Sequence, residues 1–259
     1  EESNKIANFL DEKTSQIDSI VADTKRSVEE FKKYKQALIT ETVTKGLNPD
    51  VKMKDSGIEW IGEIPEHWDV MKLNQFFKQV KEKNKDLAER NLLSLSYGKI
   101  IRKNINTKEG LLPDNFEGYN IIEKDDIVLR MTDLQNDHTS LRVGLSRERG
   151  IITSAYISIR QFNEIEAEYG YYFLQSFDIY KGFYGMGSGV RQGVTFDMLK
   201  KLNILFPPIE EQRKIVTFIT EKTAHIDSLI ANKEKMVQEL EAYKKAMIYE
   251  YVTGKKEVE

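Results

Sequence analysis

The sequence predicts an α+β fold in which a mixed α/β domain is flanked by two long helices that pair as an antiparallel coiled coil. Three observations predict it: the two ends of the chain repeat each other, both repeats carry a heptad pattern, and the segment between them holds strand-like and helix-like runs. We expect the first helix over residues 1–46, the central domain over 47–208 and the second helix over 209–259.

The repeat joins the two ends of the chain. Residues 1–44 align without a gap on residues 210–253, and 21 of the 44 aligned positions are identical. Shared helical composition alone rarely gives an unbroken match of this length, so the pattern predicts a duplicated element. The second copy follows a complete central segment, whereas the first begins in the middle of the motif. We therefore expect the chain to be half of a larger duplicated protein.

Both repeats have the seven-residue apolar spacing of a coiled-coil seam. The predicted seam residues are Ile17, Val21, Val28, Phe31 and Leu38 in the first copy, and Ile226, Ile230, Val237, Leu240 and Met247 in the second. Neither copy contains Gly or Pro before Gly46 or Gly254, so each helix can extend for about 60 Å. A narrow apolar stripe needs a partner helix, and the other copy is the simplest one. Lys233 and Lys244 interrupt the seam. We expect them to direct their charges to water, with setting of the helix register as the alternative.

The central segment predicts short strands and helices. The expected strands are Asn91–Tyr97, Asp126–Met131, Ile151–Arg160 and Asn203–Phe206; the expected helices are Glu168–Phe183 and Phe196–Leu202, with a loop over Tyr184–Gly193. Thr195 is a plausible N-cap for the last helix. Both tryptophans, Trp60 and Trp68, lie in the entry segment, where we expect them to anchor the linker to the domain.

Composition excludes several classes of protein. The chain has no cysteine, which excludes disulfides and thiolate metal sites. No apolar run approaches the roughly 18 residues of a membrane span, so we expect no membrane association. The absence of cysteine fits a reducing cytosol, and we expect a cytoplasmic location. The formal net charge is -3, so any nucleic-acid binding depends on local charge.

Catalytic patterns are scarce. The three histidines, His67, His138 and His225, have no ligand-like spacing, so we predict no metal site. The glycine-rich stretch 185–189 lacks the Lys-Ser/Thr of a phosphate loop. We interpret Asp125-Asp126 as loop charges. The sequence therefore favours a binding protein that is not itself an enzyme.

Local charge favours nucleic acid as the ligand. Residues 70–103 carry nine Lys/Arg against three Asp/Glu, enough to dock phosphates, although 78–85 could equally be a solvated helix face. Two loops, 130–137 and 188–193, are rich in side chains that read base edges: Arg pairs with guanine, and Gln or Asn with adenine. We expect base contacts from Arg130, Thr132, Gln135, Asn136, Arg191 and Gln192, and phosphate contacts from Lys99, Arg102, Lys103, Ser188 and Gly189.

Several stretches resemble the specificity subunits of type I restriction-modification systems. The junction 202–212, with Phe206-Pro207-Pro208, is similar to the conserved junction of that family, and residues 56–65 are similar to the usual entry to a target recognition domain. Residues 126–130, 150–156 and 187–192 are similar to motifs in the body of such domains. The resemblance covers essentially the whole chain.

The resemblance implies function and partners. Each recognition domain of such a subunit reads one half of a bipartite double-stranded DNA site, and the subunit positions methylation and restriction subunits. S-adenosylmethionine, ATP and Mg are then expected in those partners, with no cofactor on this chain. With one recognition domain, the chain is expected to need a second half or to form a homodimer, which would read an inverted repeat. The alternatives are a coiled-coil scaffold whose domain binds protein, or a stand-alone repressor.

Overall fold

The computed structural model describes residues 2–106, 115–136, 141–187 and 193–258. The chain forms two compact units. The first comprises Glu1–Leu38 and Ile219–Glu259, and the second comprises Ile39–Phe218. Within the described residues, no helix combines the length and apolarity that a bilayer crossing requires.

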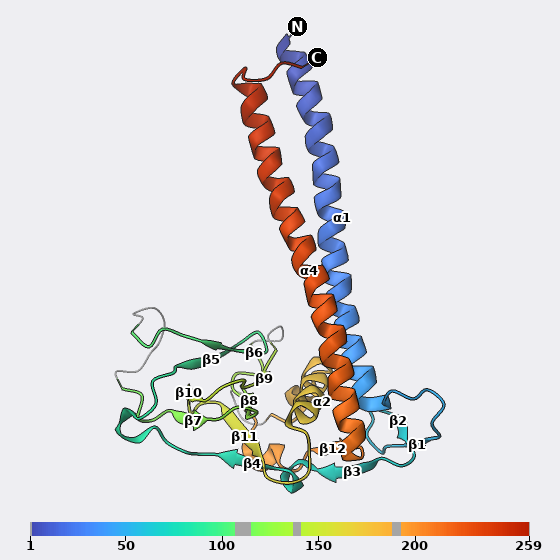
Figure 1. Cartoon of the computed structure of the whole chain (residues 1–259), viewed down its shortest axis with the longest axis vertical. Helices are drawn as coiled ribbons and strands as arrows, with labels where there is room; N and C mark the ends of the chain where they lie inside the picture. Colours follow the sequence, from blue (N-terminus) through green and yellow to red (C-terminus); the bar gives the residue numbers. More distant parts are fainter. Residues whose placement is uncertain (1, 107–114, 137–140, 188–192, 259) are drawn as a thin grey trace. The chain divides into compact units, whose positions relative to one another are not determined.

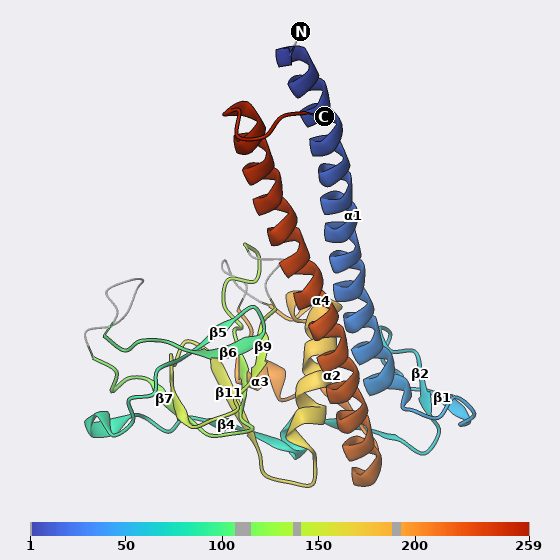
Figure 2. The same ribbon diagram turned by 45° about the horizontal axis from the view of Figure 1, so that its top comes forward.

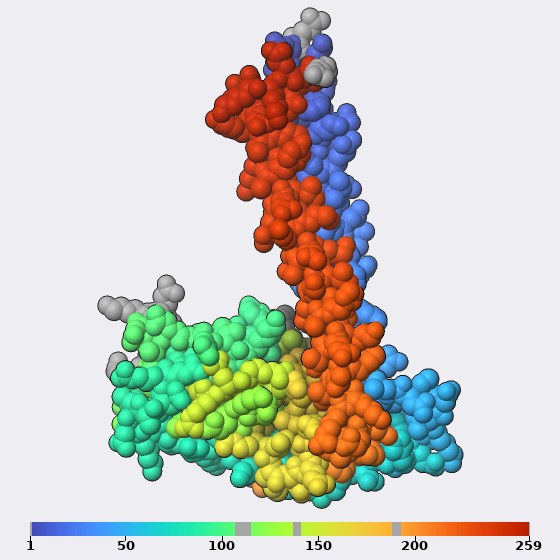
Figure 3. Space-filling model, in the orientation of Figure 1, coloured from blue at the N-terminus to red at the C-terminus, as the bar shows by residue number. Residues whose placement is uncertain are grey.

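The first unit is an antiparallel pair of helices (Figures 1 and 2). It is supplied by α1 (Glu2–Lys45) and α4 (Ile209–Val252), which have 44 residues each. The side chains of the two helices meet along this pair (Figure 3). All ten predicted seam residues lie in two apolar clusters between the helices. Lys233, one of the two lysines of the seam, carries its ammonium 5.9 Å from the centre of the Phe31 ring.

The two apolar clusters are equivalent under the sequence repeat, in which residue i corresponds to residue i + 209. One cluster contains Ile17, Val21, Val237, Leu240 and Met247, with Leu10 and Tyr251 at its edge. The other contains Ile226, Ile230, Val28, Phe31 and Leu38. The first five residues of one map in order onto the five of the other. The duplicated sequence thus folds into a helix pair with approximate two-fold symmetry.

One set of ion pairs obeys the same symmetry. Lys35 lies 2.6 Å from Asp227, and Lys244 lies 2.5 Å from Asp18. Each pair is the repeat equivalent of the other. Lys244 therefore reaches a carboxylate on the opposite helix from its place in the seam.

A second set of ion pairs obeys the same symmetry, but here each copy of the repeat supplies only one sign of charge. Lys25 lies 2.8 Å from Glu241, and the equivalent pair is Lys32 with Glu234, at 3.6 Å. The first copy supplies both lysines and the second supplies both glutamates. Exposed pairs contribute roughly 0.2–1 kcal/mol each, so the seam provides most of the stability. The charges instead favour pairing of α1 with α4. Pairing of two copies of the same helix would bring lysine against lysine, or glutamate against glutamate.

The second unit is built from short antiparallel strands (Figure 1). Its largest sheet has the order β4-β11-β8-β9, formed by Phe77–Val80, Ile157–Gln161, Ile127–Leu129 and Val143–Leu145. The two-stranded sheets are β1-β2 (Met53–Asp55, Glu63–Pro65), β3-β12 (Asp69–Lys72, Asn203–Phe206), β5-β6 (Leu93–Ser96, Lys99–Arg102) and β7-β10 (Asn120–Ile122, Gly150–Ile152).

Short helices complete the second unit. They are α2 (Ala167–Ile179), α3 (Phe196–Leu199) and the 3-10 turns η1 (Leu73–Gln75), η2 (Lys85–Leu87) and η3 (Gly182–Gly185). The α+β architecture predicted from the sequence is therefore present. Trp60 packs against the rings of Phe173 and Phe177 on α2, with centroids 5.6 and 5.7 Å apart. Trp68 is fully buried, so both tryptophans anchor the entry segment, as expected.

Several predicted elements were too long. The expected strand Ile151–Arg160 is two strands, because the Tyr156 amide bonds to the Thr153 carbonyl and turns the chain between them. The expected helix Glu168–Phe183 ends at Ile179, shortly before Lys181 adopts a positive φ of 68°. The last short helix ends at Leu199 instead of Leu202. Residues 78–80 belong to β4, so the alternative of a solvated helix face there is wrong.

Candidate nucleic-acid interface

The loop that follows β8 carries the first set of predicted base-contacting residues. Met131 and Leu134 are buried, whereas Thr132 is exposed between them. Gln135 and Asn136 are exposed at the next two positions. Apolar side chains thus fix the loop to the core while polar side chains face solvent. This arrangement allows base-edge contacts without loss of the core.

The conformation of this loop is further restrained. Asp133 has a positive φ of 59°, which is uncommon for a residue other than glycine. Its carboxylate accepts a hydrogen bond of 2.6 Å from the Asn136 side chain. Arg130, at the start of the loop, is half-buried and its amide bonds to the Arg142 carbonyl at 2.9 Å. The four predicted base-contacting residues of this loop are therefore brought together on one short segment.

The β5-β6 hairpin carries the predicted phosphate contacts. It turns at Tyr97 and Gly98, which both have positive φ, 47° and 76°. A Cβ on Gly98 would lie 2.9 Å from the Leu141 side chain, so the turn requires glycine. Lys99 and Lys103 are exposed. Within the described segments neither lysine has a carboxylate partner, so both ammonium groups are available to an anion.

Arg102 differs from the two lysines. Its guanidinium Nε lies 2.8 Å from each carboxylate oxygen of Glu148. The hydrogen bond from Arg102 lowers the pKa of Glu148, and the same contact raises the pKa of Arg102. The Arg102 charge is therefore neutralised within the protein, which makes it a weaker candidate for phosphate binding than Lys99 or Lys103.

The second predicted loop lies mostly outside the described residues. Ser188, Gly189, Arg191 and Gln192 belong to 188–192, which the structure does not describe. The described chain resumes at Gly193, and the Val194 amide donates a hydrogen bond of 3.0 Å to the Met131 carbonyl. The end of this loop is thus attached to the loop after β8.

The interpretation of Asp126 as a loop charge was wrong. Its side chain is buried and accepts two hydrogen bonds of 2.7 Å from Arg160 across the β8-β11 pair. This contact raises the pKa of Arg160. The Asp125-Asp126 pair follows a polar run, which gave no signal that one carboxylate would turn inward.

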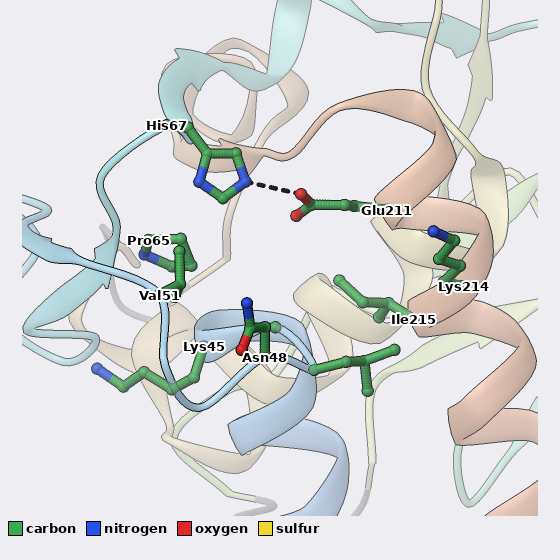
Figure 4. Close-up of a pocket in the computed structure, with 10 residues that line it drawn as sticks. Lys45, Asn48, Val51, Pro65, His67, Glu211, Lys214 and Ile215 are labelled. Carbon is green, nitrogen blue, oxygen red and sulfur yellow. Dashed lines mark hydrogen bonds and ion pairs between the residues drawn. The ribbon is translucent and has the colours of Figure 1, made fainter.

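A pocket of about 210 Å³ lies elsewhere in the second unit, where α1 ends and α4 begins. In Figure 4, the ring of His67 and the carboxylate of Glu211 point toward each other, and Nε2 and Oε1 are 2.7 Å apart. The other oxygen of Glu211 accepts a hydrogen bond of 2.7 Å from the Trp68 indole. No predicted DNA-contacting residue lines this pocket, and its polar contacts attach the first turn of α4 to the entry segment.

The described residues contain no candidate metal site. No group of three His, Cys, Asp or Glu side chains there could hold a metal ion. His67 contacts Glu211, His225 is exposed on α4, and His138 lies outside the described residues.

Sequence reasoning missed one residue next to the interface. Arg142 is fully buried beneath the loop after β8. It follows a polar run that looks like an exposed turn, so its sequence context gave no signal of burial.

Known proteins resemble this chain over most of its length. The family model of the type I restriction modification DNA specificity domain matches residues 65–242. The MjaX and MjaVIII type I restriction enzyme specificity subunits of Methanocaldococcus jannaschii are 25% and 24% identical over 98% of this chain. The chain spans 57% and 60% of the length of these relatives.

Solved structures show the same fold. A chain from the structure of an assembled type I R-M system superimposes with a TM-score of 0.68 at 13% identity, covering 97% of this chain and 59% of that one. The HsdS subunit from Thermoanaerobacter tengcongensis gives 0.52 at 12% identity, covering 96% and 57%. Since the family model covers more than half of the sequence, the chain belongs to the type I restriction modification DNA specificity domain family.

Proposed function

We propose that this chain is the DNA sequence-recognition component of a type I restriction-modification complex and reads one half of a bipartite site. The observation that supports it most is the loop after β8, where exposed Thr132, Gln135 and Asn136 alternate with buried Met131 and Leu134. Amide and hydroxyl side chains on a fixed backbone suit base edges in the major groove.

The β5-β6 hairpin supplies the second part of the proposal. Lys99 and Lys103 are free to neutralise phosphates, and such contacts orient a protein on DNA without reading its sequence. Affinity that depends on them should fall steeply with salt. Reading and orientation are thus divided between two structural elements, the loop and the hairpin.

Activity belongs to the assembled complex in this proposal. The chain contributes recognition and no catalytic group to that complex. It positions methylation subunits, which use S-adenosylmethionine, and restriction subunits, which use ATP and Mg. The second half of the DNA site is read by another recognition domain or by a second copy of this chain. The complex acts in the cytoplasm, where its DNA is found.

The test is co-expression of this chain with its methylation subunit, followed by mapping of adenine methylation across the host genome. A methylated interrupted palindrome supports a pair of identical chains, each reading the same half-site. Co-purification without methylation supports a chain that requires a different second half. Absence of both methylation and co-purification would contradict the proposed function.

A further inference from the structure

Arg142 is a buried charged residue that the proposed DNA contacts do not include. Its exposed fraction is 0%, and it directly precedes β9. Removing a guanidinium from water is strongly unfavourable unless its donors find partners. The partners of Arg142 therefore indicate what its burial achieves.

The guanidinium donates hydrogen bonds to the backbone of the loop after β8. Nη1 donates to the carbonyl oxygens of Arg130 and Thr132, at 3.1 and 3.0 Å. Nη2 donates to the carbonyl oxygen of Asp133, at 3.3 Å. A planar guanidinium can donate to several acceptors at once. A lysine ammonium cannot reproduce this planar arrangement of donors.

The Arg142 residue is itself held from three directions. Its amide donates to a carboxylate oxygen of Asp178 on α2, at 2.6 Å, and its carbonyl accepts from the Arg130 amide at 2.9 Å. Its Nε lies 3.2 Å from the Tyr184 hydroxyl, and the guanidinium carbon lies 5.4 Å from the centre of that ring. The guanidinium is thus fixed relative to β8, α2 and η3.

Four consecutive backbone carbonyls of the loop accept hydrogen bonds from groups in the protein interior. Arg142 bonds to those of residues 130, 132 and 133, and the Val194 amide bonds to that of Met131. With these oxygens turned inward, the polar side chains at 132, 135 and 136 face solvent. Arg142 therefore fixes the direction in which the reading side chains point.

We propose that Arg142 is the positioning residue of the recognition loop, and that it determines the selectivity of DNA reading without contacting DNA. This inference rests on the proposed function, because it assigns the reading of bases to the loop after β8. It differs from a purely structural role in one respect: loss of Arg142 should alter selectivity more than nonspecific affinity.

The test compares Arg142→Lys with a matched control, Arg160→Lys, in the full chain. Arg160 also makes buried hydrogen bonds, but to the Asp126 carboxylate and not to the loop. The first readout is hydrogen exchange of the free chain. We expect Arg142→Lys to speed exchange by about tenfold at the hydrogen-bonded amides of Arg130, Asn136 and Val194, and Arg160→Lys to leave these amides unchanged.

The second readout uses the chain in complex with its methylation subunit and compares its own site with single-base variants of that site. We expect Arg142→Lys to lower discrimination by about tenfold at the base pairs read by this loop, with binding to random DNA unchanged. If Arg142→Lys does not fold, Tyr184→Phe, which removes only the hydroxyl, should produce the same changes at a few-fold level.

The outcomes separate the two ideas. A folded Arg142→Lys chain with wild-type exchange at the amides of Arg130, Asn136 and Val194, or with wild-type discrimination, overturns the role of Arg142. A wild-type complex without any sequence preference overturns the proposed function, and the exchange experiment then still decides whether Arg142 holds the loop.

Discussion

At the scale of single residues, the loop after β8 separates two tasks by alternating burial. Met131 and Leu134 hold it to the core, which leaves the exposed side chains of Thr132 and Gln135 accessible to a ligand. A residue of the second group can therefore be replaced without a cavity in the core. Substitutions there should change DNA reading and leave stability almost unchanged.

We expect Gln135→Ala to relax selection at one base pair, because a bidentate amide contact contributes about 1–3 kcal/mol of discrimination. Competition binding with single-base variants of the site measures it. Gln16→Ala, an exposed glutamine of α1, is the matched control and should keep full discrimination. Unchanged discrimination in Gln135→Ala would remove this residue from the base contacts.

Lys103 and Arg102 should behave differently although they are neighbours. Lys103→Ala should weaken binding to all sequences alike and reduce the salt slope by roughly 1. Replacing both Arg102 and Glu148 with alanine should leave the salt slope close to that of the wild type, since the pair neutralises itself. A titration of affinity against salt distinguishes them, and equal losses in both variants would argue against the assignment.

Residue roles were only partly predictable from the sequence. Side-chain chemistry placed Thr132, Gln135 and Asn136 among the candidates, and they are exposed as a base contact requires. The pairing of Arg102 with Glu148 was not foreseen, because β6 and the β9-β10 turn are 46 residues apart. Burial of Arg142 depends in the same way on contacts between distant segments.

At the scale of elements, the two duplicated helices carry charges that favour the pairing of α1 with α4. The apolar clusters are equivalent in the two copies, whereas the Lys25-Glu241 and Lys32-Glu234 pairs assign one sign of charge to each copy. The apolar seam alone would not distinguish the α1–α4 pair from a pair of identical helices. The charged residues provide this distinction.

Exchanging these charges tests their role. Lys25→Glu combined with Lys32→Glu should destabilise the helix pair by about 1–2 kcal/mol at low salt, because it replaces two attractions with repulsions. Adding Glu234→Lys and Glu241→Lys should restore most of the lost stability, and the remaining loss should reflect the Lys32–Glu29 pair within α1. Denaturant unfolding at low and high salt measures both variants. A fourfold variant as unstable as the double one would show that these charges act independently.

The end of α1 should be sensitive to one methyl group. Gly46 has a φ of 78°, and a Cβ there would lie 3.1 Å from the Trp68 ring. We expect Gly46→Ala to lower stability by about 1–2 kcal/mol through backbone strain and crowding. Thermal unfolding measures the loss. Gly254→Ala, with φ 70° and open space around it, should cost clearly less; equal losses would mean that Trp68 adds nothing.

Helices were more predictable than strands. The long heptad pattern and the Gly46 stop signal gave bounds close to those of α1 and α4. The sequence predicts one strand over Ile151–Arg160, because isoleucines occur on both sides of the Thr153 turn. Strand breaks of this kind depend on local hydrogen bonds that apolar patterning does not record.

At the scale of the whole molecule, the repeat and the single recognition domain agree with a chain that spans just over half of its relatives. A helix pair with approximate two-fold symmetry presents equivalent surfaces twice. Under the proposed function, each of these surfaces would receive one methylation subunit.

The central claim is that the second unit reads DNA sequence. The most direct measurement is selection from a random DNA library by this chain in complex with its methylation subunit. We predict enrichment of one short motif, which Gln135→Ala degrades at a single position. Enrichment of no motif, with binding that depends on salt alone, would contradict it.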